Sequence, residues 1–105
     1  MPITQINSFD ATQLTPLGFT TIAGTGAAQG LGTIPDNARV AIIQGYGGAL
    51  ATRRIVWRDD GTAPTAADNG GLAIHIDETI QYIGDLSAFQ WIETGMTGIA
   101  VAFYS

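Results

Sequence analysis

The sequence predicts an all-β fold, an antiparallel β-sandwich of roughly six to eight short strands. No window of the chain has the 3.6-residue periodicity of an amphipathic helix. β-branched and aromatic residues gather in short runs, and clusters of Gly, Pro, Asn and Asp separate these runs about every ten residues. Among sandwiches we favour a jelly roll over an immunoglobulin-like arrangement, and the pattern itself does not specify strand order.

Charged residues are scarce in this chain. They make up 12% of the 105 residues, against about 25% in an ordinary soluble domain, and there is no lysine. Lys and Glu normally cover a soluble surface, and protein interfaces are depleted in both. We therefore expect part of the exterior to be buried against copies of the chain, as a homo-oligomer, or against other proteins. The alternative is a monomer with an uncharged, Thr-rich surface.

The composition also argues against several functions. A net charge of −5 does not suit nucleic-acid binding, which depends on Lys and Arg. No apolar run reaches the roughly 18 residues of a membrane-spanning helix, so no membrane association is expected. The absence of cysteine excludes disulfides and thiolate metal sites. The amino terminus lacks the basic-then-apolar order of a signal peptide, so we expect synthesis in a cytosol.

The first 18 residues are expected to form an extended arm or an edge strand, and residues 19–105 the sandwich domain. The apolar spacing in the arm fits neither a helix nor a strand. The arm is then either the first strand of the domain or a strap that lies on a neighbour. If it is a strap, its candidate interface residues are the apolar side chains Ile3, Ile6 and Phe9.

The expected strands are, in order, 19–23, 39–44, 50–57, 72–76, 79–83, 88–92 and 99–104. The strands at 39–44 and 99–104 are apolar on both faces, which is typical of a central strand or, for the last one, of a subunit interface. Alternation places Leu72, Ile74 and Ile76 inward. In the following strands Phe89 and Trp91 share one side.

The strand at 50–57 leads into a turn with a distinctive composition. Its residues are Arg58, Asp59, Asp60, Gly61 and, after a short interval, Pro64. Asp-Gly is a turn pair because glycine adopts a positive φ without a Cβ clash. Pro64 keeps its segment out of a central ladder. We expect an ion pair or side-chain-to-backbone bonds of Arg58 and Asp59 to hold this turn.

Residues 24–32 form a glycine-rich loop. Its G-x-G-x-x-x-G spacing differs by one residue from the dinucleotide-binding fingerprint, and no amphipathic helix follows it. We therefore expect a loop that is mobile or shaped by a partner, and no phosphate site.

No set of residues suggests catalysis, a metal or a cofactor. Most carboxylates stand in turns, where Asp bonds to nearby backbone amides. Asp59, Asp60 and Asp68 offer oxygens to calcium, but their spacing matches no calcium-binding loop. His75 is the single histidine, and without a nearby Ser or Cys nucleophile it reads as a surface or interface residue. We predict a protein that is not an enzyme and uses no cofactor.

Several aromatic residues have the chemistry to stack on sugar rings, namely Tyr46, Trp57, Tyr82, Trp91 and Tyr104. Both tryptophans lie in apolar strands, which favours a place in the core. Tyr46 is flanked by glycines and is the aromatic residue expected to be exposed. Beyond the arm, the candidate interface residues are Tyr46, the basic doublet Arg53 and Arg54, and the terminal Phe103 and Tyr104.

Four stretches carry a resemblance to a known group of proteins: Ile34–Arg39, Trp57–Ala66, Gly84–Phe89 and the terminal Phe103-Tyr104. Across about residues 18–105 the chain resembles small tailed-bacteriophage proteins that are encoded among virion structural genes. The Trp-Arg-Asp-Asp-Gly-Thr-x-Pro-Thr run is the specific part of the match. The chain departs from the group at His75-Ile76-Asp77, where a small-residue turn is expected.

The resemblance implies a virion component and no catalytic residues. A capsid cement or decoration protein on the outer capsid surface, which bridges neighbouring major capsid proteins, is the function we expect. A head–tail adaptor or a tail component is an alternative with the same low-charge surfaces. A carbohydrate-binding module for host attachment is a second alternative, and its candidate contact is Tyr46. An enzyme is the least expected of these readings.

Overall fold

The computed structural model describes residues 14–48 and 53–105. Over these ranges the chain forms strands and one short 3-10 turn, with no α-helix, so the all-β prediction is confirmed there. The strands are β1 (Pro16–Ala23), β2 (Val40–Tyr46), β3 (Arg54–Arg58), β4 (Leu72–His75), β5 (Thr79–Ile83), β6 (Gln90–Thr94) and β7 (Gly98–Tyr104). Ile3, Ile6 and Phe9, and with them the expected arm as far as residue 13, lie outside the described residues.

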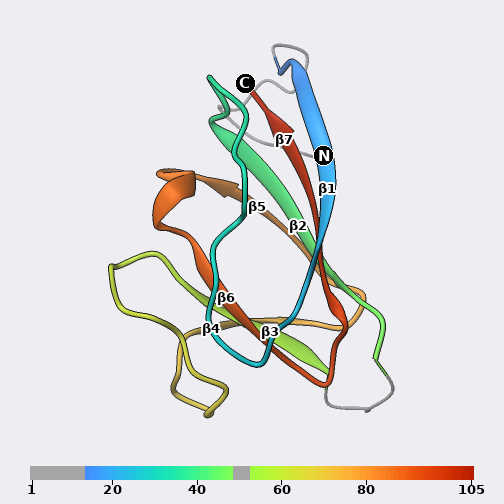
Figure 1. The fold of residues 1–105 in the computed structure, drawn as a ribbon, viewed down its shortest axis with the longest axis vertical. Coiled ribbons are helices and arrows are strands. Elements are labelled where there is room, and N and C mark those ends of the chain that lie inside the picture. Colours follow the sequence, from blue (N-terminus) through green and yellow to red (C-terminus); the bar gives the residue numbers. More distant parts are fainter. Residues whose placement is uncertain (1–13, 49–52) are drawn as a thin grey trace.

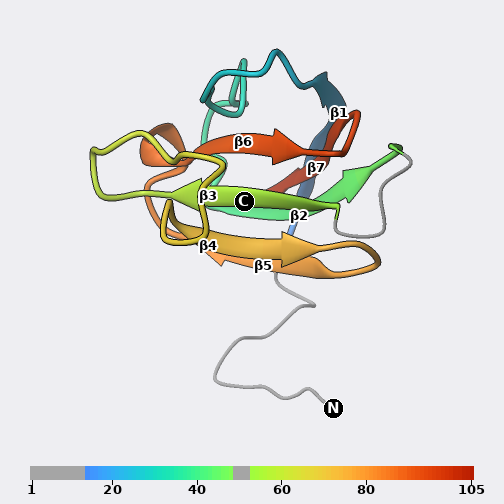
Figure 2. The ribbon, with the colours of Figure 1, turned by 90° about the horizontal axis from the view of Figure 1, so that it is seen from below.

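The strands form two antiparallel sheets that pack against each other as a sandwich (Figure 1). Sheet A has the order β1-β7-β2-β5, and sheet B has the order β4-β3-β6. Figure 2 shows the three strands of sheet B side by side, with sheet A behind them. Gln29, in the loop after β1, makes an isolated antiparallel bridge with Trp91 at the edge of β6 that β3 leaves open.

Inward side chains of both sheets build one hydrophobic core. Its largest fully buried members are Trp91, Phe89, Leu31, Ile43, Ile55, Ile74, Ile99 and Val101. Phe89 and Trp91 are both 0% exposed, so the prediction that they share one side is confirmed. Fully burying one such side chain contributes about 1.5–3 kcal/mol, and this burial is the main force that holds the two sheets together.

The last strand, β7, lies between β1 and β2 and is therefore central in sheet A. This position explains why its sequence is apolar on both faces. Ile99, Val101 and Phe103 point into the core, whereas the residues between them point outward. Phe103 is 2% exposed, so its expected role at an interface is wrong: alternation along β7 places its ring inside the sandwich.

Two local expectations differ from the structure. Leu72 is 64% exposed although it shares a face with the buried Ile74, because it begins β4 at the margin of the sandwich, beyond the core. β6 begins two residues later than expected because Leu86–Ala88 form a 3-10 turn. The Asp85 side chain caps this turn by accepting a hydrogen bond from the Ser87 backbone N–H at 3.0 Å.

The corner between β4 and β5 contains His75-Ile76-Asp77, where a small-residue turn was expected. The Glu78 N–H donates to the His75 carbonyl at 3.1 Å, and the Glu78 carboxylate accepts from the His75 N–H at 2.7 Å. Asp77 adopts a φ of +68°, in the left-handed region that glycine fills at lower cost. The tight turn therefore forms without a small residue, and the Glu78 carboxylate helps to close it.

The glycine-rich loop at 24–32 is attached to the domain. Gln29 and Trp91 exchange two backbone hydrogen bonds of 3.0 and 2.8 Å, and the Trp91 indole N–H donates to the Gly30 carbonyl at 2.9 Å. The Gly26 N–H donates to the Glu93 carboxylate at 2.9 Å, and Leu31 is 2% exposed in the core. The loop closes the side of the sandwich between β1 and β6 (Figure 2), so it is anchored to the domain at Gly26, Gln29, Gly30 and Leu31.

Trp91 is predicted to hold this loop in place. Trp91→Phe keeps a buried ring but removes the indole donor to Gly30, so we expect a loss of about 1–3 kcal/mol in the free energy of unfolding. Amide hydrogen exchange should accelerate most in residues 24–32. Trp57→Phe is the matched control, because Trp57 pairs with Trp91 across β3 and β6 but the described residues show no hydrogen bond from its indole to this loop. Equal acceleration in both variants would contradict the assignment.

Candidate protein-interaction surface

Charge is segregated between the two sheets. None of the residues in β1, β2, β5 and β7, the strands of sheet A, is charged. Within the described ranges, every charged residue lies in sheet B or in a loop. The strands of sheet A are therefore a large uncharged part of this charge-poor sequence. The inner face of this sheet builds the core, and its outer face points away from the domain.

The strand register defines that outer face in three cross-strand rows. From β1 to β5 they read Thr21-Ala100-Gln44-Thr79, then Phe19-Ala102-Ile42-Gln81, then Pro16-Tyr104-Val40-Ile83. We call these twelve residues the sheet A face. Phe19 is 70% exposed and Ile83 is 59% exposed, while Val40 is 2% exposed. Large apolar side chains thus stand in water at the two edge strands of an uncharged sheet.

The outer face of sheet B is different because the chain covers it itself. Val56 points outward from β3 and is 2% exposed, as Val40 is on sheet A, but Val56 is covered by a loop, since a Cβ at Gly71 would lie 3.0 Å from its Cγ1. The segment 59–71 lies against it: Arg54 of β3 donates to the Ala66 carbonyl at 2.8 Å, and Pro64 and Gly70 of this segment are buried. No loop of comparable length lies against the sheet A face among the described residues (Figure 1). An uncharged face on which large apolar side chains stay exposed is typical of a surface that contacts another protein.

The turn after β3 is held by an ion pair of Arg58, as expected, but the partner is Asp60, and Asp59 bonds instead to Tyr82. Arg58 pairs with the Asp60 carboxylate through two hydrogen bonds, one of them from Nε at 3.0 Å. Asp60 also accepts from the Thr62 N–H at 3.2 Å, and Gly61 has a φ of +85°. The hydrogen bonds from Arg58, before all other causes, lower the pKa of Asp60 to about 2. Arg58, Asp60 and Gly61 are therefore structural residues.

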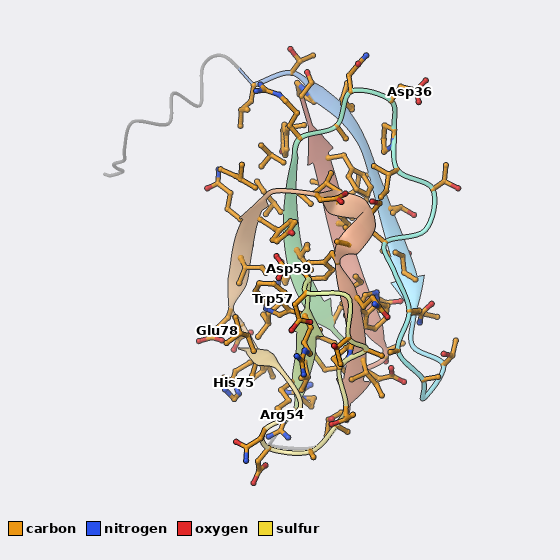
Figure 3. All side chains as sticks on the ribbon, turned by 90° about the vertical axis from the view of Figure 1, so that its left-hand side faces the viewer. Asp36, Arg54, Trp57, Asp59, His75 and Glu78 are labelled. Atoms are coloured by element: carbon orange, nitrogen blue, oxygen red, sulfur yellow. The ribbon has the colours of Figure 1, made fainter. Side chains whose placement is uncertain are left out.

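Asp59 connects this turn to the other sheet. Its carboxylate accepts a hydrogen bond of 2.8 Å from the Tyr82 hydroxyl of β5. Tyr82 also completes a group of three rings with Trp57 and Phe89, at centroid distances of 4.9 to 5.7 Å. Figure 3 shows Trp57 and Asp59 close together on this side of the molecule. Burial, followed by the bond and the charge of Asp59, raises the pKa of Tyr82 to about 12.

Arg53 and Arg54 bind the domain's own backbone. Arg53 donates to the carbonyls of Gly47 and Gly48, at 3.2 and 3.0 Å. Arg54 binds the Ala66 carbonyl and pairs with Asp68, whose side chain is 94% exposed, at 3.5 Å. Both guanidinium groups therefore help to secure loops, while the Nε of each is buried without a hydrogen-bond partner among the described residues.

A depression of about 400 Å³ lies beside the turn, and among its lining residues are Trp57, Asp68, Asn69 and Leu72. Three of its carboxylates, Asp59, Asp60 and Asp68, are those considered for calcium. Asp59 and Asp60 are engaged by Tyr82 and Arg58, and no group of three potential metal ligands occurs within residues 14–48 and 53–105. His75 is exposed at the end of β4, close to Arg54 (Figure 3). No helix in these ranges is long and apolar enough to cross a membrane.

Of the expected interface residues in the described ranges, only Tyr104 belongs to the sheet A face, and Tyr46 lies on the same side of the sheet at the opposite end of β2; both are half-buried. Tyr46 ends β2 rather than standing on a loop. Phe19 and Ile83, the exposed large apolar residues of the face, are absent from the sequence-based candidates. The signal for them is alternation: each is a large apolar residue at an outward position of a strand.

Comparison with protein families, with curated proteins and with solved structures found no match to this chain.

The Tyr82–Asp59 contact predicts a specific loss of stability at high pH. The pKa of Tyr82 is 10.0 in the unfolded chain and about 12 in the folded chain. The stabilisation that its hydrogen bond to Asp59 gives the fold is therefore complete below pH 10 and is lost as the pH rises towards 12. Thermal unfolding between pH 8 and 12 measures this.

Tyr82→Phe should be about 1 kcal/mol less stable at neutral pH and should lose less stability across that window. Asp59→Asn keeps the tyrosine ring but removes the negative charge beside it. Its loss of stability between pH 8 and 12 should therefore lie between the losses of the wild type and of Tyr82→Phe. Parallel curves for the wild type and Tyr82→Phe would contradict the account.

Proposed function

We propose that this chain is a non-enzymatic virion structural protein of a tailed bacteriophage, specifically a capsid cement or decoration protein. In this role it sits on the outer capsid surface, bridges neighbouring major capsid proteins and contacts copies of itself. It uses no cofactor and binds neither nucleic acid nor membrane. The observation that carries the proposal is the uncharged sheet A face with Phe19 and Ile83 in water.

The surface chemistry supports this role. A cement protein makes many repeated contacts with identical neighbours, so each contact can be weak and the assembly still be held firmly. An uncharged face loses no ion hydration when it is covered, whereas burying ionised groups costs several kcal/mol each. The compact core and the self-bonded turn at 58–62 make the domain a rigid spacer between such contacts.

The strand order also supports the jelly-roll arrangement that we propose for the sandwich. A jelly roll has eight strands in two sheets. Gln29 bridges the open edge of β6, in the position that an eighth strand would take. If the segment around Gln29, which follows β1 and precedes β2 in the sequence, is counted as a short strand of sheet B, each sheet has four strands. Every connection then crosses between the sheets except the one from β3 to β4.

The copy number of the chain in purified particles of the phage that encodes it tests the proposal. We expect hundreds of copies per virion by quantitative mass spectrometry, because cement proteins follow the symmetry of the whole shell. Roughly a dozen copies or fewer would favour a head–tail adaptor or a tail component, which occupies one vertex. Absence of the chain from the virion would overturn the proposal.

The amino-terminal arm is predicted to contribute to this attachment. Deletion of residues 1–13 leaves β1 intact, including the two backbone hydrogen bonds that join Thr15 and Ser105. We expect an unchanged melting temperature and a reduced occupancy on shells, because Ile3, Ile6 and Phe9 are lost as apolar contacts. Full occupancy by the shortened chain would show that the arm has no such role.

A carbohydrate-binding module is the second candidate, and the depression beside Trp57 and Asn69 is the observation in its favour. Concave sites with an aromatic ring and a few polar groups are typical of small-ligand binding. A glycan array with the wild type and Asn69→Ala tests it. An array without hits, together with unchanged host adsorption by Tyr46→Ala, would dismiss this function.

A further inference from the structure

We propose that the sheet A face packs against the same face of a second copy, forming a two-fold dimer in which the two sheets stack. The inference rests on the assembly role proposed above and names the occupant of the uncovered face. The other occupants of such a face, a capsid protein among them, are distinguished by the experiments below.

Charge complementarity favours a second copy. A partner with a charged patch would bury its ions against a face that has no counter-charge to offer, and unpaired buried ions are costly. The matching surface is another uncharged sheet. Of the two outer sheet faces in the described domain, only the sheet A face is free of charge, because Arg54 and Arg58 point outward from sheet B.

The shape of the sheet A face also suits packing against the same face of a second copy. The central strand β7 contributes the small residues Ala100 and Ala102 to two neighbouring rows, and these form a low strip. Phe19 stands next to Ala102 on the edge strand β1 and is 70% exposed. In a two-fold stack, the Phe19 ring of each copy lies over the alanine strip of the other. Stacked sheets of this kind lie about 10 Å apart.

The size of the face predicts a weak dimer. Four strands spaced about 4.8 Å apart, over about six residues of about 3.3 Å each, give a flat area on the order of 400 Å² per copy. Two such faces fall below the roughly 1,200 Å² of a stable interface. We therefore expect a Kd on the order of 10–100 μM in solution. On a shell, where copies are held side by side, the effective concentration is far higher and the contact is occupied.

Sedimentation equilibrium of the full chain between about 1 and 500 μM tests the dimer. Phe19→Glu and Ile83→Glu each place a carboxylate on the face and should raise Kd at least about 30-fold. Leu72→Glu is the matched control, because Leu72 is 64% exposed but lies in sheet B, and its dimer should match the wild type. Circular dichroism confirms that each variant is folded.

Two results would overturn the inference: a wild type that stays monomeric throughout, or a dimer that Phe19→Glu leaves intact. The first result leaves the face to a capsid protein, and the virion copy number tests that role separately. The proposed virion function can equally fail while the dimer stands.

Single cysteines supply a second readout, since the chain has none of its own. We expect Thr21→Cys on the sheet A face to form covalent dimers with a short bis-maleimide. Ala73→Cys, at an outward position of β4, should form few. Equal yields at both positions would contradict face-to-face pairing.

Discussion

The constraint on which this molecule depends is that a small two-sheet domain has one core and two outer faces, and each outer face must be made compatible with water or be covered. Sheet B meets this constraint within the chain. Segment 59–71 lies over Val56, and Arg54 and Arg58 present charge beside it. Sheet A has no charged residue in any of its strands, and Phe19 and Ile83 remain exposed. The asymmetry between the two sheets is the reason for reading the protein as a component of an assembly.

The turn after β3 has a structural role that its composition suggested. Arg58 and Asp60 close the turn, Gly61 supplies its positive φ, and Asp59 reaches across to Tyr82 in the other sheet. Together with the rings of Trp57 and Phe89, these contacts join the two sheets at one end of the sandwich. The distinctive composition of the Trp57–Thr65 run is thus explained by stability, and no chemistry on a ligand is needed to account for it.

Much of the strand pattern could be predicted because turn residues and alternation are local properties. β5 was predicted at its observed bounds, and the central place of β7 followed from its apolar sequence. The errors arose at residues whose burial or attachment depends on contacts between segments far apart in the sequence. Leu72 follows the inward alternation but lies past the edge of the core, and Gln29 and Leu31 fix a loop whose glycines suggested freedom. Phe103 was placed at an interface because a sequence apolar on both faces does not say which face turns inward.

The sheet A face was beyond prediction for a related reason. Its four strands are not consecutive in the sequence, so the absence of charge becomes visible as one surface only when β1, β7, β2 and β5 are known to be neighbours. The low overall charge pointed to a covered surface without saying where it lies. Sheet membership supplies the location, and register supplies the residues.

Hydroxyl-radical footprinting tests the central claim most directly, because it reports side-chain exposure residue by residue. The dilute chain and the native assembly are oxidised under the same dose and compared by mass spectrometry. The account predicts that oxidation of Phe19 and Ile83 falls strongly in the assembly while that of Leu72 stays the same. Equal oxidation of Phe19 in both states would contradict it, since the sheet A face would then remain open to water.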